Sequence, residues 1–277
     1  VAVGRNALDA NTTGHSNTAL GESSLTTNTT GIRNVAIGQN ALAINTTGIQ
    51  NVAIGRNALD ANTTASNNIA VGDSALTANT TGTRNTAVGS AALDALTTEN
   101  DNTAIGYAAL SSEVSGFRNT AVGSGSGANQ NGGTNNTLLG YNAGSDISTG
   151  DANTFIGSDC GDANTTASNN TAVGQAALGA NTTGTTNVAV GTSALTANTT
   201  ASNNTGIGYN ALAANTTGAQ NTAVGRLALD ASTTANDNTA IGNASMTATT
   251  TGYDNTSVGS GSMRNNTTGS LNTAFGR

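Results

Sequence analysis

The stretch that decides the fold is T-A-V-G-Q-A-A-L-G-A-N-T-T-G-T-T-N at residues 171–187, one copy of a unit that repeats along the chain. Sixteen copies of 17 residues follow one another from Val1 without insertion or deletion, and five further residues complete the sequence. A fixed short period is typical of solenoid proteins rather than of an ordinary globular domain. The unit is too short, and too rich in Gly, Thr and Asn, for a helical repeat.

We number the 17 positions of the unit as columns, with Val1 in column 1. Column 1 is β-branched and column 3 is apolar in all 17 occurrences, while column 2 is Ala in 13 of them. Column 4 is always Gly, as in Gly4, Gly21 and Gly38, which suggests a positive φ angle or a close backbone approach. Columns 1 to 4 therefore predict a short strand that is ended by a glycine turn.

With one coil per repeat, each column becomes a ladder with a spacing of about 4.8 Å. Column 17 is Asn in all sixteen units, as in Asn17, Asn34 and Asn51, and we expect these amides to stack, each donating to the next. The Thr hydroxyls of columns 12 and 13 are expected to do the same. The sequence thus predicts an all-β chain, a β-solenoid or parallel β-roll of about sixteen 17-residue coils.

The apolar pattern predicts which columns form the core. Column 8 is mostly Leu, so we expect columns 3 and 8 to be buried and columns 5, 9 and 16 to be exposed. The strand is apolar on both faces, and a face directed away from the coil's own core is expected to pack on another chain. A disordered linker is the alternative that the 3% aromatic content favours, but it does not explain the fixed apolar columns.

The pattern loosens between about residues 96 and 161. Column 8 becomes Gly in three successive units, and in two of them column 2 enlarges from Ala to Leu138 or Phe155. Because packed interiors tolerate little change in volume, this exchange indicates that columns 2 and 8 share one space. We therefore expect Phe155 to occupy the volume left open near Gly161.

Composition excludes several classes of function. The chain has 8 Arg, no Lys and 15 acidic residues, and so lacks the basic stripe that nucleic-acid binding requires. It has no apolar run of the ~18 residues that a membrane span needs, and one Cys gives no disulfide framework. The sequence begins inside a repeat, so we interpret residues 1–277 as a single repetitive rod that is a segment of a longer protein.

The strand motif T-A-V-G-x-x-A-L at residues 86–93, preceded by Asn85, resembles the S-V-A-I-G-x-x-A repeats in the heads of trimeric autotransporter adhesins. It is also similar to the N-T-A-I-G-x-x-A-L-x-x-N-T-T-G repeats of tail-fibre-like proteins. The resemblance covers the whole chain and implies a trimeric, left-handed β-roll on a cell surface or virion. The 17-residue unit is longer than the typical adhesin head repeat.

Residues that could carry chemistry are few. Cys160 could act as a nucleophile with His15 as its base, but the two lie nine units apart. Since every coil repeats its neighbours and catalysis needs a unique constellation, we predict no enzyme and no cofactor. Carboxylates in the irregular region could hold Ca²⁺, although they also suit solvated loops, and these weak candidates are Asp146, Asp151, Asp159 and Asp162.

The N-T-T triplets can be interpreted in three ways. They are N-x-[ST] sequons that could carry glycans, whereas a stacked ladder would need the side chains bare. Thr ladders also suggest ice binding, but Thr12 and Thr13 are adjacent and would point to opposite faces. The sequons are Asn11, Asn28, Asn45, Asn62, Asn79, Asn164, Asn181, Asn198, Asn215 and Asn266.

The sequence as a whole favours a structural extracellular fibre or stalk segment of a surface adhesin or a tail-fibre-like protein. Its expected partner is itself, as a trimer or fibre, with a host-surface glycan or protein as a second candidate. The alternative function is a ligand-binding solenoid surface, for ice or glycan, built from the Thr and Asn ladders.

Overall fold

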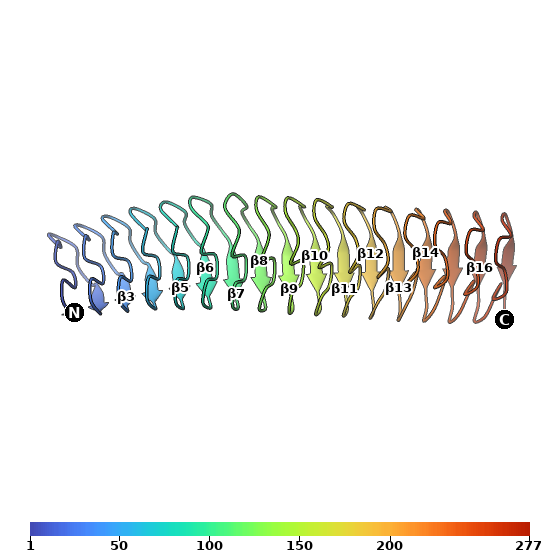
Figure 1. Ribbon diagram of the computed structural model, residues 1–277, viewed down its shortest axis with the longest axis horizontal. Helices are drawn as coiled ribbons and strands as arrows, with labels where there is room; N and C mark the ends of the chain where they lie inside the picture. Colours follow the sequence, from blue (N-terminus) through green and yellow to red (C-terminus); the bar gives the residue numbers. More distant parts are fainter. The chain divides into compact units, whose positions relative to one another are not determined.

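The computed structural model describes residues 1–277, which form two compact units, Val1–Asn136 and Thr137–Arg277. The chain is all-β, with one short strand in each coil and no helix (Figure 1). The strands of the first unit are β1 (Ala2–Val3), β2 (Thr18–Leu20), β3 (Val35–Ile37), β4 (Val52–Ile54), β5 (Ile69–Val71), β6 (Thr86–Val88), β7 (Thr103–Ile105) and β8 (Thr120–Val122). Those of the second unit are β9 (Thr137–Leu139), β10 (Thr154–Ile156), β11 (Thr171–Val173), β12 (Val188–Val190), β13 (Thr205–Ile207), β14 (Thr222–Val224), β15 (Thr239–Ile241), β16 (Thr256–Val258) and β17 (Thr273–Phe275).

Within each unit, consecutive strands pair in parallel and in a constant register. In β6 and β7, for example, Ala87 lies opposite Ala104, which is the residue 17 positions later in the sequence. Every other neighbouring pair inside a unit follows the same rule, from β1 with β2 to β16 with β17. The prediction of a β-solenoid with one 17-residue coil per repeat is therefore confirmed.

The interior of a coil is thin, and columns 2, 7 and 8 supply small or medium apolar side chains to it. In the coil that contains β6, these are Ala87 of column 2, Ala92 of column 7 and Leu93 of column 8, all fully buried. Leu93 has a φ of 50°, in the left-handed region that costs a residue with a side chain about 1–2 kcal/mol. Burial of the Leu side chain offsets this cost, and the burial predicted for column 8 is confirmed.

The glycines of column 4 form a line along the stack, as predicted. Gly4 and Gly21 have φ values of 135° and 137°, which residues with a side chain rarely adopt. A Cβ on Gly21 would lie 2.6 Å from the carbonyl oxygen of Gly38 in the next coil. Both expected reasons for Gly, the positive φ and the close backbone approach, are therefore present.

The prediction that column 3 is buried is wrong. Strand β6 buries Ala87, so the alternation of a strand directs Thr86 and Val88 to the opposite, outward face. No residue of column 3 is buried in any strand. Beside a Leu in column 8, the thin coil has room for Ala but not for a Val or Ile in column 2, which explains why the small column faces inward.

The polar columns follow the prediction in two of three cases. Column 16 is exposed throughout and column 5 is mostly exposed. Column 9 is half-buried in most coils, as at Asp60 and Asp94, and so does not match its predicted exposure. Column 9 lies beside the buried column 8, where neighbouring coils cover part of it.

The irregular region keeps the coil but changes what fills column 11. The carboxylate of Glu113 accepts hydrogen bonds from the backbone N–H groups of Gly116 and Gly132, and from Nε2 of Gln130 at 2.8 Å. The buried charge therefore has donors for both of its oxygens, as a buried carboxylate requires. Within the irregular region, the buried residues that replace the usual Asn are Leu96, Glu113, Gln130 and Ile147.

Candidate functional site

The outward side chains of columns 1 and 3 form what we call the outer sheet face of each unit. It consists only of Thr, Val, Ile, Leu and Phe, so it carries no charge. Its column 3 members include side chains such as Ile54 and Ile105, which are 36% and 40% exposed. The column 1 Thr hydroxyls, as at Thr86 and Thr222, make no side-chain hydrogen bond with the protein. The face is thus uncharged, regular and unpartnered within the chain.

Charged side chains border the outer sheet face in columns 5 and 16, which stand two residues after and two residues before the outward pair. In column 5, Arg56 pairs with Asp73 of the next coil, with Nε and Oδ1 2.8 Å apart. In column 16, Arg84 pairs with Asp101 in the same way, and Arg5 with Glu22 is a third such pair. These exposed pairs contribute little stability.

The hydrogen bonds in the Arg56–Asp73 and Arg84–Asp101 pairs change the pKa values of the two Asp carboxyls. The Arg56 guanidinium lowers the pKa of the Asp73 carboxyl, and Arg84 lowers the pKa of Asp101. In both cases the largest cause is the hydrogen bond itself. Each pair joins one coil to the next, but its exposure keeps its contribution to the stacking of coils small.

Column 17 forms a ladder, but its partners differ from those predicted. Oδ1 of Asn34 accepts the backbone N–H of Asn51 at 2.9 Å, and its Nδ2 donates to the carbonyl oxygen of Gly48 at 2.8 Å. Donation from amide to amide occurs in this column at the later coils, as from Asn255 to Asn238 at 3.0 Å. The Asn side chain therefore serves mainly as a bridge between the backbones of adjacent coils.

The amide-to-amide ladder expected for column 17 is found in column 11. Nδ2 of Asn45 donates to Oδ1 of Asn28 at 2.9 Å and also contacts the carbonyl oxygen of Gly48 at 3.2 Å. Asn28 and Asn45 are fully buried, while Asn11 is half-buried and donates to Gly14. A glycan on Nδ2 would replace these hydrogen bonds, so the folded ladder favours bare side chains.

The two Thr columns behave differently from each other. Oγ1 of Thr46 in column 12 donates to the carbonyl oxygen of Thr63 in the next coil at 3.0 Å. Thr47 in column 13 is exposed, as are almost all residues of that column. The predicted hydroxyl ladder is therefore a hydroxyl-to-backbone ladder in column 12, and column 13 presents Thr to solvent.

Cys160 and His15 have separate surroundings. The Cys160 thiol is buried and contacts the carbonyl oxygen of Ala172 at 3.3 Å. Burial raises the pKa of this thiol to about 12, so it is protonated at neutral pH. His15 is exposed, and its Nδ1 lies 3.2 Å from Oγ of Ser16. Neither residue contributes to a nucleophile–base arrangement.

The acidic candidates are partly brought together. Asp162 is half-buried, and burial raises its pKa, with smaller contributions from the charges of Asp159 and Asp146. Asp151 lies in column 15, whereas these three residues lie in columns 6, 9 and 10 of their coils. No three His, Cys, Asp or Glu side chains in the chain are arranged so that they could hold a metal ion.

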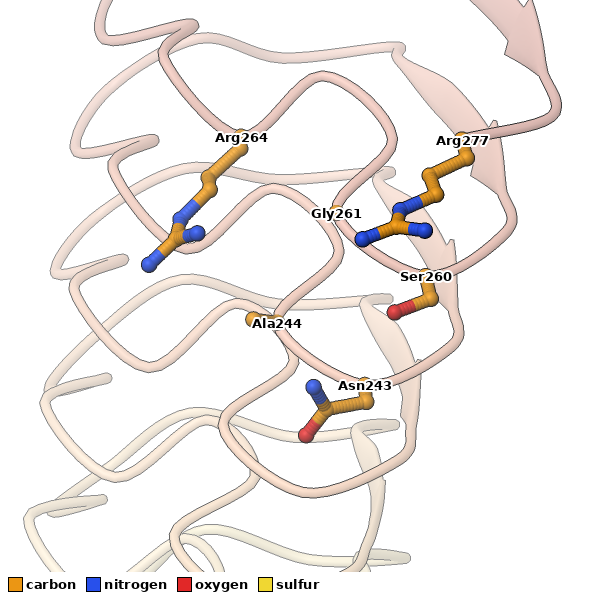
Figure 2. A pocket seen from close by; sticks show the side chains of 6 residues that line it. All are labelled: Asn243, Ala244, Ser260, Gly261, Arg264 and Arg277. Carbon is orange, nitrogen blue, oxygen red and sulfur yellow. The ribbon is translucent and has the colours of Figure 1, made fainter.

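A pocket of about 310 Å³ lies on the last coils of the second unit. Figure 2 shows Asn243, Ser260 and Arg277 one above another, as members of column 5 in successive coils. The pocket is open and its side chains belong to the variable outer columns. Its lining residues are Asn243, Ala244, Ser260, Gly261, Arg264 and Arg277.

Comparison with known proteins gives no assignment. No family model matches the chain, and no curated protein matches it. The structure has no helix that is long and apolar enough to cross a membrane. The sequence predicts an outward apolar strand face, but it places column 3 in the core, so it does not identify the two columns that form the outer sheet face. The signal is the alternation of side chains along a strand: when the small Ala of column 2 points into the coil, columns 1 and 3 must point outward.

Proposed function

We propose that this chain is a structural segment of an extracellular fibre or stalk, of the kind found in surface adhesins and tail-fibre-like proteins. The observation that carries the proposal is that one set of bonds joins each coil to the next throughout each unit. Strand pairing and the Asn of column 17 act between neighbouring coils throughout each unit, and the Thr of column 12 does the same outside the irregular region. Such nearest-neighbour stability suits an element that varies in length.

The absence of a unique constellation supports a structural rather than a catalytic role. The chemistry-bearing residues Cys160 and His15 have separate neighbours, and repeated coils offer the same groups many times. The resemblance of the strand motif to surface and fibre repeats is what supports the extracellular location in this proposal. The alternative role, in which Thr ladders bind ice or glycan, finds outward hydroxyls in columns 1 and 13.

Changing the length by whole and partial repeats tests the proposal. Duplicating Thr171–Asn187 should add one coil, and so about 4.8 Å to the second unit, without lowering the free energy of unfolding. The matched control inserts only the first eight residues of this unit, which breaks the register. Circular dichroism, chemical unfolding and small-angle X-ray scattering would follow both variants.

Two results would count against the structural role. If whole and partial insertions destabilised the chain equally, coils would not be interchangeable spacer elements. Antibodies raised against the chain should also label projecting filaments on intact cells or particles of the source. Labelling found only after the cells are opened would contradict an extracellular fibre.

A further inference from the structure

We propose that Asn131–Gly132 is a self-modification site, at which the carboxylate of Glu113 acts as the base for deamidation of Asn131. The proposal does not depend on the fibre role. Deamidation of an Asn begins when the backbone nitrogen of the next residue attacks Cγ of its side chain. Gly obstructs this attack least, because it has no Cβ. Asn131 is the one Asn of the chain that Gly follows.

The Asn residues of the ladders are protected against the same reaction. Every Asn of columns 11 and 17 is followed by Thr, Val or Ile, whose branched Cβ crowds the attacking nitrogen. Their amides are also held by hydrogen bonds, as between Asn45 and Asn28 at 2.9 Å. Asn131 lacks the branched neighbour, and its side chain is exposed in column 12, in place of the usual Thr. The reaction is therefore directed to one residue of an Asn-rich chain.

The backbone at Gly132 departs from that of the ordinary coil. In many coils, the N–H of column 13 donates to the carbonyl oxygen of column 12 in the next coil, as from Thr30 to Thr46 at 3.2 Å. The N–H of Gly132 donates instead to Oε1 of Glu113, in the preceding coil, at 2.9 Å. Its φ is 110°, which a residue with a side chain rarely adopts. The nitrogen that attacks Asn131 is thus hydrogen-bonded to a carboxylate.

Glu113 is placed to take the proton of this nitrogen. It is fully buried, and its oxygens also accept hydrogen bonds from the backbone of Ser115 and Gly116 and from Nε2 of Gln130. These donors fix the carboxylate, which belongs to none of the ion pairs. A general base must lie within about 2.6–3.2 Å of the atom whose proton it removes. Attack proceeds perpendicular to the planar peptide group, so the N–H stays directed at Glu113 while the new bond forms.

The reaction balances without any cofactor. The nitrogen of Gly132 bonds to Cγ of Asn131, and its proton passes to Oε1 of Glu113. The C–N bond of the side-chain amide then breaks, and its NH2 group leaves as ammonia with the proton that Glu113 returns. The product is a succinimide ring. Water opens this ring at either carbonyl group, which gives aspartate or isoaspartate at position 131.

Isoaspartate changes the coil that holds it. It adds one carbon atom to the main chain, so the coil that begins with β8 no longer matches its neighbour in length. The new carboxylate also stands one residue from the N–H that Glu113 binds, and like charges that close repel each other. The modification therefore loosens the last coil of the first unit, and the fraction modified records the age of the chain.

The first test uses the wild-type full chain alone. Native and urea-unfolded samples are incubated side by side at pH 7, and peptide mass spectrometry follows the replacement of NH2 by OH at each Asn. Protein-isoaspartate methyltransferase counts the isoaspartate. Asn131 should react about 100-fold faster in the native chain than in urea, which is the effect of a positioned base. A native rate equal to or below the rate in urea would overturn the proposal, because Glu113 would then shield the nitrogen.

The pH profile separates base catalysis from a favourable backbone conformation. In urea, the rate at Asn131 should rise in proportion to hydroxide. In the native chain it should be almost constant between about pH 6 and 8, because the ionised Glu113 supplies the base; a native rate proportional to hydroxide would contradict this role. The other titratable or charged side chains in the coils of β6, β7 and β8, none of them a hydrogen-bond partner of Glu113, are Asp94, Glu99, Asp101, Tyr107 and Arg118.

Substitution of the base gives a third measurement. Glu113→Gln keeps the shape of the side chain but removes its charge, so Asn131 should deamidate about 100-fold more slowly. Glu99→Gln makes the same change in the preceding coil and should react like the wild type. Equal rates in Glu113→Gln and the wild type would overturn the proposal. Circular dichroism checks that both variants are folded, and if Glu113→Gln is not, the two wild-type measurements still decide.

Discussion

Phe155 fills the space beside Gly161: a Cβ built on Gly161 would lie 2.5 Å from Cε2 of Phe155. Phe155 is fully buried, and Gly161 has a φ of 58°, close to the 56° of Leu178 in the next coil. One coil earlier, a Cβ on Gly144 would lie 2.8 Å from Cδ2 of Leu138. The expectation that columns 2 and 8 share one space is confirmed at both coils.

A double-mutant cycle at these two positions should show strong coupling. Phe155→Ala should lower the free energy of unfolding by about 3–5 kcal/mol, because it leaves a cavity. Gly161→Leu alone should also destabilise, since the new side chain meets the Phe155 ring. The double variant should recover part of both losses by recreating the usual Ala and Leu pair. Urea unfolding of the four proteins measures the coupling, and additive effects would contradict a shared space.

The Asn ladder of column 17 should contribute more stability than its polar character suggests. Oδ1 of Asn187 accepts the backbone N–H of Asn204, and its Nδ2 donates to the carbonyl oxygen of Ala201. Asn187→Ala leaves the buried N–H of Asn204 without its acceptor, while the carbonyl oxygen of Ala201 keeps Nδ2 of Asn198 as a donor, so we expect a loss of about 1–3 kcal/mol. Thr186→Ala, at the exposed neighbour, is the matched control and should be nearly silent. Hydrogen exchange at Asn204 should accelerate; an unchanged rate would contradict the bridge.

The sequence predicts the period, the parallel stacking and the glycine line because each depends on one strictly repeated feature. The side of the wall to which column 3 points depends instead on the volume inside the coil. A strand such as Thr86–Val88 is apolar on both faces, so pattern alone does not separate them. The buried Asn28 and Asn34 were also hard to predict as core residues, since polar side chains enter a core only when neighbouring coils supply their hydrogen bonds.

The left-handed residues of columns 6, 8 and 16 have no clear signal in the sequence either. Leu42 and Arg33 have φ values of 51° and 59°, although neither residue type favours this region. The closed coil imposes the conformation, and burial or coil-to-coil bonds offset its cost. This cost is a property of the whole coil, so it becomes visible only in the structure.

The contributions of Asp94 and Asp73 to the free energy of unfolding should change with pH in opposite directions. Burial raises the pKa of Asp94, and its buried Oδ1 lacks a hydrogen-bond partner. The folded state thus holds the proton more tightly, so this carboxyl stabilises the fold below the ordinary pKa and the contribution is lost as pH rises. Asp94→Asn should therefore stabilise the chain slightly at pH 7, and the gain should disappear near pH 3.

Asp73 is the control for this behaviour, because Arg56 lowers its pKa. Its contribution is present above the ordinary pKa and is lost as pH falls through the lowered value. Asp73→Asn should slightly destabilise the chain at pH 7 and have no effect at acidic pH. Urea unfolding at several pH values measures both variants, and shifts of the same sign would contradict the assigned surroundings.

The Cys160 thiol should be unreactive until the chain unfolds. Burial raises its pKa from 9.0 to about 12, so the folded state favours the protonated thiol. Its contribution to stability is complete below the ordinary pKa of 9.0 and is lost as pH rises toward about 12. Cys160→Ala is a matched control, because Ala177 occupies the same column of the next coil. Above pH 9, the wild-type protein should therefore lose stability relative to the Cys160→Ala variant. At pH 8, iodoacetamide should label Cys160 far more slowly in the native protein than in urea, and equal rates with native circular dichroism would show that the thiol is not buried.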